Sequence, residues 1–208
     1  IGMKFGPDLN AYTSFDETVY MLKVPTADAE KMDKAFQILG DWAHNLTLDG
    51  EEIDKERGVV IEEWRLGQGA NMRMINKQLP IMLKDSKYAR RLPIGQKAVL
   101  DTFKHASVKK FYEDWYRPEL MAMIAVGDFD KMTVINLIDQ YFSNIPKSNY
   151  PVKRPIIPVP DHDETLFAIA SDPEASYSNV SIIHKFDINN DKTSISAFRK
   201  NLVGNLYN

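Results

Sequence analysis

The chain has 208 residues, of which 44% are hydrophobic and 26% are charged, and its formal net charge is −3. These values are typical of a globular protein with one large or two small domains, and the acidic balance argues against nucleic acid as a partner. No apolar run is long enough to span a bilayer, so we expect no membrane span. The absence of cysteine excludes disulfides, thiolate metal sites and a cysteine nucleophile.

The first half of the sequence predicts a strand hairpin followed by helices. Polar and apolar side chains alternate over residues 8–15 and 17–24, which favours two strands joined by a turn. The following apolar residues recur with the helical period, and Thr26 or Asp28 is suited to cap that helix. The predicted helices cover residues 26–46, 52–66 and 72–83, and a loop is predicted over 85–98.

The next part of the chain predicts a buried strand between two helices. Ser107 is a candidate cap for a helix over 108–115. The nearly continuous apolar run over 120–126, bounded by a proline and a glycine, predicts a central strand that is buried on both faces. Asp130 is expected to start another helix.

A change in composition predicts a boundary between two domains. Five prolines between residues 146 and 160 indicate a stiff, extended linker. Strands over 165–170 and 179–186 and a helix from about Thr193 are expected beyond it. About sixty residues bury too little surface to be stable alone, so we interpret them as the start of a second domain. The predicted division is 1–146, 147–164 and 165–208.

Two glutamates in the segment KERGVVIEEW, residues 55–64, are candidate functional residues. Glu56 and Glu63 are seven residues apart, almost two helical turns, so both side chains leave the same face. Because apolar residues crowd around them, we expect the helix to be at least half buried and Glu63 to be a buried acid. A buried carboxylate needs a cation, a donor or a metal as its partner. The alternative is a pair of surface acids, salt-bridged on a charge-rich helix of an unrelated α+β protein.

The other residues provide no complete catalytic set. None of the four histidines forms an HExxH or HxxEH motif, and the sequence contains no glycine-rich phosphate loop and no nucleophile elbow. The strand over residues 8–13 has a polar face and is expected at the margin of the sheet. An edge strand can accept an extended peptide as an additional strand, although an ordinary edge hairpin would look the same.

Several segments together resemble the inverted-zincin (HxxEH) metallopeptidases of the pitrilysin, insulinase and mitochondrial-processing-peptidase family, in particular their bacterial zinc protease branch. The resemblance spans nearly the whole chain, and its segments occur in the family's order. They are residues 6–13, 56–63, 91–95, 111–118, 125–129 and 172–174.

The resemblance implies an α+β fold with a mixed, largely antiparallel sheet packed by helices, and a pitrilysin-like repeat followed by the start of a second one. It implies a zinc-dependent endopeptidase that hydrolyses peptide bonds with metal-activated water. Glu63 would be a metal ligand, and Glu56 would support the site through hydrogen bonds. The backbone of a peptide or unfolded polypeptide substrate would pair with the strand made by Asn10, Ala11, Tyr12 and Thr13.

In this family HxxEH supplies two zinc ligands and the general base, and these 208 residues do not contain it. We therefore expect zinc in the intact parent protein, no zinc bound to this fragment, and no catalysis by the fragment alone. Residues 1–6 resemble the end of a helix followed by a turn, and the resemblance implies dependence on a distant C-terminal half. The missing N- and C-terminal parts of the same chain are therefore expected partners. A non-catalytic peptide-binding or scaffold homologue is the alternative. The branch suggests a location in the bacterial periplasm or envelope.

Overall fold

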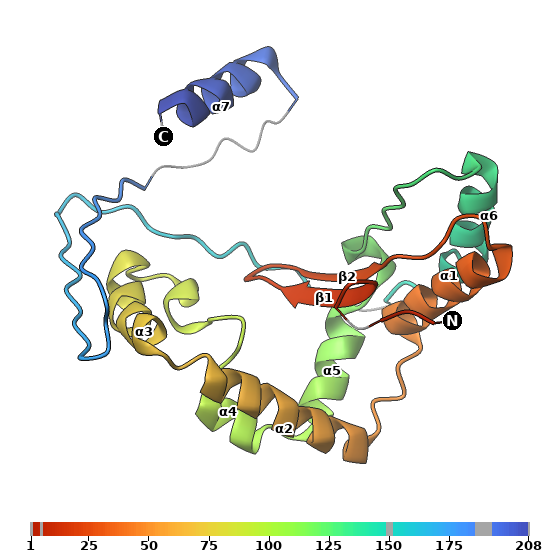
Figure 1. Cartoon of the computed structure of the whole chain (residues 1–208), viewed down its shortest axis with the longest axis horizontal. Helices are drawn as coiled ribbons and strands as arrows, with labels where there is room; N and C mark the ends of the chain where they lie inside the picture. The colour runs from red at the N-terminus through yellow and green to blue at the C-terminus, as the bar shows by residue number, and fades with distance from the viewer. Residues whose placement is uncertain (1, 5, 149–151, 186–192, 208) are drawn as a thin grey trace.

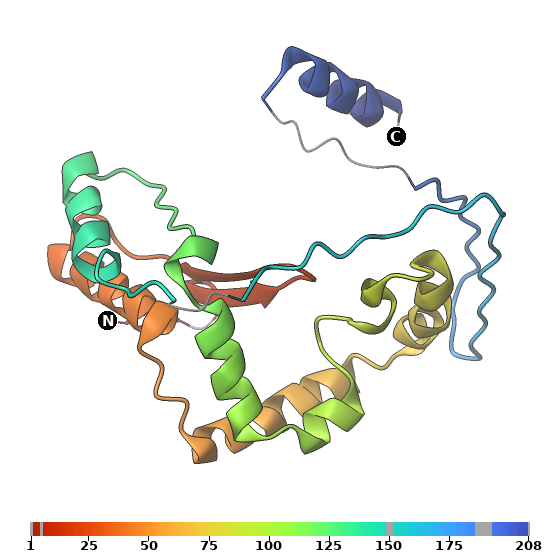
Figure 2. The same ribbon diagram turned by 180° about the vertical axis from the view of Figure 1, so that it is seen from behind.

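The computed structural model describes residues 2–4, 6–148, 152–185 and 193–207. Helices α3, α2 and α5 follow an arc, α1 and α6 lie together at one end of it, and α7 lies apart from the rest (Figures 1 and 2). The α-helices are α1 (Ala29–His44), α2 (Gly50–Leu66), α3 (Ala70–Met82), α4 (Lys97–Thr102), α5 (His105–Trp115), α6 (Lys131–Phe142) and α7 (Ile195–Tyr207). Two short 3-10 helices are η1 (Lys87–Arg90) and η2 (Pro118–Leu120). No helix in the described part of the chain is both long and apolar enough to cross a membrane.

The predicted α+β class and the N-terminal hairpin are confirmed. Strands β1 (Leu9–Thr13) and β2 (Thr18–Leu22) pair antiparallel, with Leu9 opposite Leu22 and Thr13 opposite Thr18. The turn is closed by a hydrogen bond from the Ser14 N–H to the Glu17 carbonyl at 2.8 Å. Over the described residues this pair is the whole sheet, so the sheet is smaller than the sequence predicts.

The hairpin is fixed to helices at the middle of β2 and at its turn. On β2, the Tyr20 hydroxyl lies 2.5 Å from the Tyr116 hydroxyl at the end of α5, and the Tyr20 ring also packs against Trp42 of α1. At the turn, the Tyr88 hydroxyl of η1 donates to the Asp16 carboxylate at 2.8 Å. These contacts hold the hairpin on the concave side of the arc of helices (Figure 1).

The helical caps at Asp28 and Asp130 are confirmed. Asp28 accepts a hydrogen bond from the Lys31 N–H at 3.1 Å, and Asp130 accepts one from the Thr133 N–H at 2.7 Å. Each cap satisfies a backbone donor that has no partner within its own helix. The two capped helices, α1 and α6, then bury Met32, Phe36 and Val134 as a small apolar core.

Other predicted boundaries are wrong. Helix α5 begins at His105 and Ser107 does not cap it, because the cap position is Lys104 and makes no side-chain hydrogen bond. Residues expected as a loop over 85–98 include η1 and the first two residues of α4, so both are elements that the sequence did not predict. The start of α5 moves because helix ends depend on local hydrogen bonds that the periodicity does not report.

The predicted strands in the second half of the chain are absent from the described residues. The run over 121–126 is irregular, and Ile124 and Val126 are 79% and 91% exposed rather than buried. Residues 165–170 and 179–185 are extended without strand pairing, and Phe186 lies outside the described residues. A β-strand needs a neighbour for its backbone groups, and β1 and β2 pair only with each other. Ile124, Val126, Phe167 and Ile169 are exposed, whereas Met123 and Ala125 pack against the core between α1 and α6.

Ion pairs attach the segment after the proline-rich region to α3. Arg73 donates two hydrogen bonds to the Asp172 carboxylate, at 2.7 and 2.8 Å, and a third to Glu174 at 2.6 Å. The Asp172 side chain is only 7% exposed. Because Arg73 donates to it, the pKa of the Asp172 carboxyl falls from 3.8 to about 2.

Replacing Arg73 by alanine should release this segment from α3. We expect proteolytic cleavage between residues 165 and 185 to become on the order of tenfold faster, because local opening loses its main electrostatic restraint. The depressed pKa means that the ion pair is complete above pH 3.8 and is lost as the pH falls through about 2. Limited proteolysis with mass spectrometry measures the rate. Lys84→Ala, which removes a single exposed pair with Glu164, is the control and should change the rate little.

Candidate functional site

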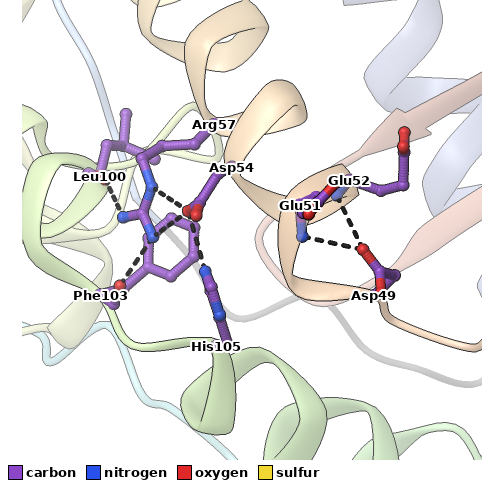
Figure 3. Close-up of polar contacts among 8 residues, drawn as sticks. All are labelled: Asp49, Glu51, Glu52, Asp54, Arg57, Leu100, Phe103 and His105. Atoms are coloured by element: carbon purple, nitrogen blue, oxygen red, sulfur yellow. Dashed lines mark hydrogen bonds and ion pairs between the residues drawn. The ribbon is translucent and has the colours of Figure 1, made fainter.

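Helix α2 carries both candidate glutamates, and its start is fixed by a cap. Asp49 accepts hydrogen bonds from the N–H groups of Glu51 and Glu52, at 2.9 and 3.4 Å (Figure 3). These acidic residues also lie in the first turn, where the helix dipole favours negative charge. The cap fixes where α2 begins, and this start determines the position of each later side chain along the helix axis.

Arg57 fixes one face of α2 to the end of α4 and the α4–α5 connection, and we call this set of contacts the clamp (Figure 3). Its guanidinium donates to the carbonyl of Leu100 at 2.8 Å and to that of Phe103 at 2.9 Å. The same group lies 3.7 Å from the centre of the Phe103 ring, a favourable stacking distance. Only 17% of the Arg57 side chain is exposed. One side chain therefore joins three separate groups that come more than forty residues later in the chain.

Asp54 extends the clamp to the first residue of α5. Its carboxylate accepts a hydrogen bond from His105 Nε2 at 2.9 Å and pairs with Arg57 at 3.1 Å. The hydrogen bond from His105, followed by the one from Arg57, lowers the pKa of the Asp54 carboxyl. The carboxylate form is thus the one that the clamp stabilises.

Gly50 allows the His105 ring to approach the start of α2. A Cβ atom on Gly50 would lie 2.9 Å from His105 Nδ1, a distance that forces the ring to move. The ring is held by Asp54, so it cannot shift without losing that hydrogen bond. A glycine at this position is required by the close approach and not by its backbone conformation.

Gly50→Ala should therefore destabilise the protein by about 1–2 kcal/mol, through overpacking and a weakened His105–Asp54 contact. Urea denaturation gives the free energy of unfolding. The double variant Gly50→Ala with His105→Ala is the matched test, because removing the ring removes the clash. Additive effects of the two substitutions would show that the clash does not exist.

Glu56 and Glu63 lie on one face of α2, as predicted, but Glu63 is not buried. Both residues are exposed. Neither side chain makes a hydrogen bond or an ion pair in the described part of the protein. The apolar residues expected to bury them do not do so: Val59, which lies between them along this face, is itself 60% exposed. A helical pattern in the sequence shows which residues share a face. Whether that face is buried depends on which other elements pack against it.

The edge of β1 is open over the four residues predicted to bind substrate. Leu9, the first residue of the strand, still exchanges backbone hydrogen bonds with Lys4 and Gly6. From Asn10 to Thr13 no strand pairs with the outer edge within the described residues, and all four residues are exposed. The Asn10 side-chain oxygen accepts a hydrogen bond from the Ala11 N–H at 2.9 Å. No hydrogen bond or ion pair joins this edge to α2 in the described structure.

The clamp residues Asp54, Arg57 and His105 were not identified from the sequence. The spacing of Asp54 and Arg57 by three residues was a usable signal, because such pairs meet on a helix surface. The partners of Arg57 are backbone carbonyls, and the sequence does not reveal which carbonyl a distant turn brings to a side chain.

Glu63 fits a zinc site as one oxygen ligand, because it is an unpaired and accessible carboxylate. The described residues contain no group of three or more His, Cys, Asp or Glu that could hold a metal ion. Catalytic zinc is typically held by three protein ligands and a water molecule. Further ligands would have to come from outside this set of residues.

Two family models match the chain. One is described as "Insulinase (Peptidase family M16)" and covers residues 1–89, and the other is described as "Peptidase M16 inactive domain" and covers residues 102–196. An Arabidopsis thaliana protein named "Zinc protease PQQL-like" is 39% identical over all of this chain, which spans 22% of it. The "Probable zinc protease PqqL" of Escherichia coli is 31% identical, again over all of this chain and 23% of its own length.

A solved structure has the same fold. The first half of the periplasmic protease PqqL from Escherichia coli matches with a TM-score of 0.71 and 36% identity, over 76% of this chain and 34% of that one. The α+β fold of this chain is thus the one found in this class of peptidases. The chain is a member of the M16 peptidase family, which confirms the resemblance drawn from the sequence. It spans less than a quarter of the length of the Arabidopsis thaliana and Escherichia coli relatives.

Proposed function

We propose that this chain is part of a zinc-dependent endopeptidase and contributes Glu63 as a metal ligand and β1 as a substrate-binding strand. The observation that supports this most is the asymmetry of α2. Arg57 and its partners hold one face of the helix, while Glu56 and Glu63 lie on another, where no described residue pairs with them. A carboxylate that is accessible on a fixed helix is suited to bind a cation with little reorganisation.

The chain's own residues would contribute binding and orientation. Glu63 would donate one carboxylate oxygen to the zinc ion. Glu56, almost two turns away on the same face, would support the site through hydrogen bonds to its other ligands. When bound, zinc supplies acidification of a water molecule for attack on a peptide carbonyl. The histidine ligands and the general base would come from polypeptide outside residues 1–208, so this chain alone is expected to be inactive.

The open edge of β1 is the proposed site for a peptide or unfolded polypeptide. An extended chain would add alongside Asn10–Thr13 by backbone hydrogen bonds, which give affinity without demanding one sequence. The Ala11 N–H, now bonded to the Asn10 side chain, is a donor that a peptide carbonyl could take over. The Tyr88–Asp16 bond keeps the turn of this hairpin in place during binding.

The domain division remains part of the proposal. We propose that residues 1–146 form the first domain and 147–164 a linker, of which 149–151 lie outside the described residues, and that 165–208 begin the second domain. We propose a location in the bacterial periplasm or envelope, because the matching Escherichia coli structure is that of a periplasmic protease.

The metal content of a Glu63→Gln variant of the full-length polypeptide tests the proposed function. We expect loss of zinc from this variant and retention in Glu62→Gln, whose carboxylate already pairs with Arg65 at 2.8 Å.

A further inference from the structure

The turn between α2 and α3, residues 67–69, holds the end of α2 that carries Glu63. The Gly67 N–H donates to the Glu63 carbonyl at 2.9 Å, and the Gln68 side-chain amide donates to the Trp64 carbonyl at 3.2 Å. Both carbonyls are among the last four of the helix, which have no partner within it. The turn therefore fixes the backbone of Glu63 and of the residue that follows it.

Arg73, in the first turn of α3, joins this turn to a distant part of the chain. Its Nη1 donates to the Gln68 carbonyl at 2.8 Å, and its backbone N–H donates to the Gly69 carbonyl at 3.1 Å. On the other side of the guanidinium, Nε and Nη2 donate to the two carboxylate oxygens of Asp172, at 2.8 and 2.7 Å. A two-point contact of this kind sets the orientation of the guanidinium plane. The position of Nη1 against the turn thus depends on Asp172.

The Asp172 carboxylate is held in position by the segment that carries it. The Glu174 N–H donates to its Oδ1 at 3.1 Å, and the Ala175 N–H donates to the Asp172 carbonyl, also at 3.1 Å. This segment lies against α3 (Figures 1 and 2). Lys77, one turn after Arg73, provides a separate attachment by donating to the Ser171 carbonyl at 3.3 Å.

We propose that Arg73 and Asp172 are positioning residues for Glu63. Together with Gln68 and Trp64 they form a chain of hydrogen bonds, which we call the Arg73 network. The network connects the segment after the proline-rich region to the last turn of α2. The inference rests on the proposed function, because the exact position of Glu63 matters only if its carboxylate is a metal ligand.

The clamp and the Arg73 network act on different parts of α2. The clamp acts at Arg57, six residues before Glu63, and every described contact of the clamp lies in the first half of the helix. Metal ligands need to be held within about 0.5 Å of the productive geometry. A helix that is fixed at its start only can bend or fray at its far end. The network supplies the second point of attachment, next to the proposed ligand.

The zinc affinity of the full-length polypeptide tests this proposal. Asp172→Asn keeps the size of the side chain but removes the charge that orients Arg73. We expect zinc to bind about 3–10-fold more weakly, as for a residue that acts on a site through others. Competition with a chromophoric chelator measures the affinity. Lys77→Ala is the matched control, because it weakens the attachment of the same segment to α3 without touching the network, and it should leave the affinity unchanged.

Hydrogen exchange of the zinc-free protein gives a readout that needs neither metal nor activity. In Asp172→Asn the amides of Gly67 and Gln68 should exchange on the order of tenfold faster, because the end of α2 opens more readily. The amides of α1 report global opening and should not change, nor should any of these amides in Lys77→Ala. Faster exchange in α1 as well would show general destabilisation and overturn the proposal.

A second substitution acts at the other end of the network. Gln68→Ala removes the bond to the Trp64 carbonyl and should also weaken zinc binding. Because both substitutions interrupt one network, the double variant with Asp172→Asn should lose little more affinity than the weaker-binding single variant. Fully additive losses would overturn the proposal, and so would equal losses in Asp172→Asn and Lys77→Ala.

Failure of this proposal is distinct from failure of the proposed function. If Glu63→Gln loses zinc while Asp172→Asn binds it as tightly as the unaltered protein, only the positioning role is overturned. If Glu63→Gln keeps its zinc, Glu63 is not a ligand and both conclusions fall.

Discussion

Glu63→Gln in the full-length polypeptide should abolish zinc retention and peptide cleavage while leaving the fold intact. Glutamine keeps the shape of glutamate but replaces a charged ligand oxygen by a neutral amide. Losing residues that merely support a ligand typically costs about 10–100-fold in metal affinity, so losing a ligand should cost more than about 100-fold. Because Glu63 is exposed and pairs with none of the residues that the structure describes, the free energy of unfolding of the metal-free protein should change by less than about 0.5 kcal/mol.

Two neighbouring acids provide graded controls for this result. Glu56→Gln should weaken zinc binding by about 10–100-fold without abolishing it, as expected for a supporting residue. Glu62→Gln should leave metal content unchanged, because that carboxylate pairs with Arg65. Elemental analysis after dialysis measures zinc per chain, and a fluorogenic peptide measures cleavage. Unchanged metal content in Glu63→Gln would remove Glu63 from the ligand set and with it the proposed function.

Arg57→Ala should produce the largest loss of stability, about 3 kcal/mol. The substitution leaves the carbonyls of Leu100 and Phe103 without their donor, and each unpaired and partly buried polar group costs about 1–3 kcal/mol. It also removes the ion pair with Asp54 and the contact with the Phe103 ring. Urea denaturation followed by circular dichroism measures the difference.

The effect of Arg57 should be specific to its geometry. Arg57→Lys should recover only a small part of the loss, because an ammonium group cannot reproduce the planar fork that reaches two carbonyls and a carboxylate together. Arg65→Ala is the matched control on the same helix. Its side chain is 64% exposed and pairs only with Glu62, so the loss should stay below about 0.5 kcal/mol. Equal losses at Arg57 and Arg65 would show that the clamp does not hold α2.

Features that depend on neighbouring residues were predictable from the sequence. The caps at Asp28 and Asp130 were predictable because each side chain and the backbone donor that it satisfies lie within three residues of each other. The β1–β2 hairpin was predictable because its turn brings adjacent strands together without any other element. The common face of Glu56 and Glu63 follows from the helical repeat alone.

Features that depend on distant partners were not predictable. The apolar run over 121–126 has the composition of a buried strand, yet Ile124 and Val126 are exposed, because no strand lies beside them in the described structure. The expected burial of Glu63 was wrong for the same reason: apolar neighbours on a helix bury an acid only if another element covers them. The sequence also gave no sign of the Leu100 and Phe103 carbonyls as the partners of Arg57.

The sequence by itself determined the family, through several segments that resemble it. It also determined the order of the α-helices other than α4 and the spacing of two carboxylates, because local hydrogen bonds and the helical repeat act over a few residues. The tertiary structure alone decided which face of α2 is fixed by Arg57 and which is left accessible. That choice depends on contacts made across more than forty residues of chain, and their geometry is set by packing rather than by any local pattern.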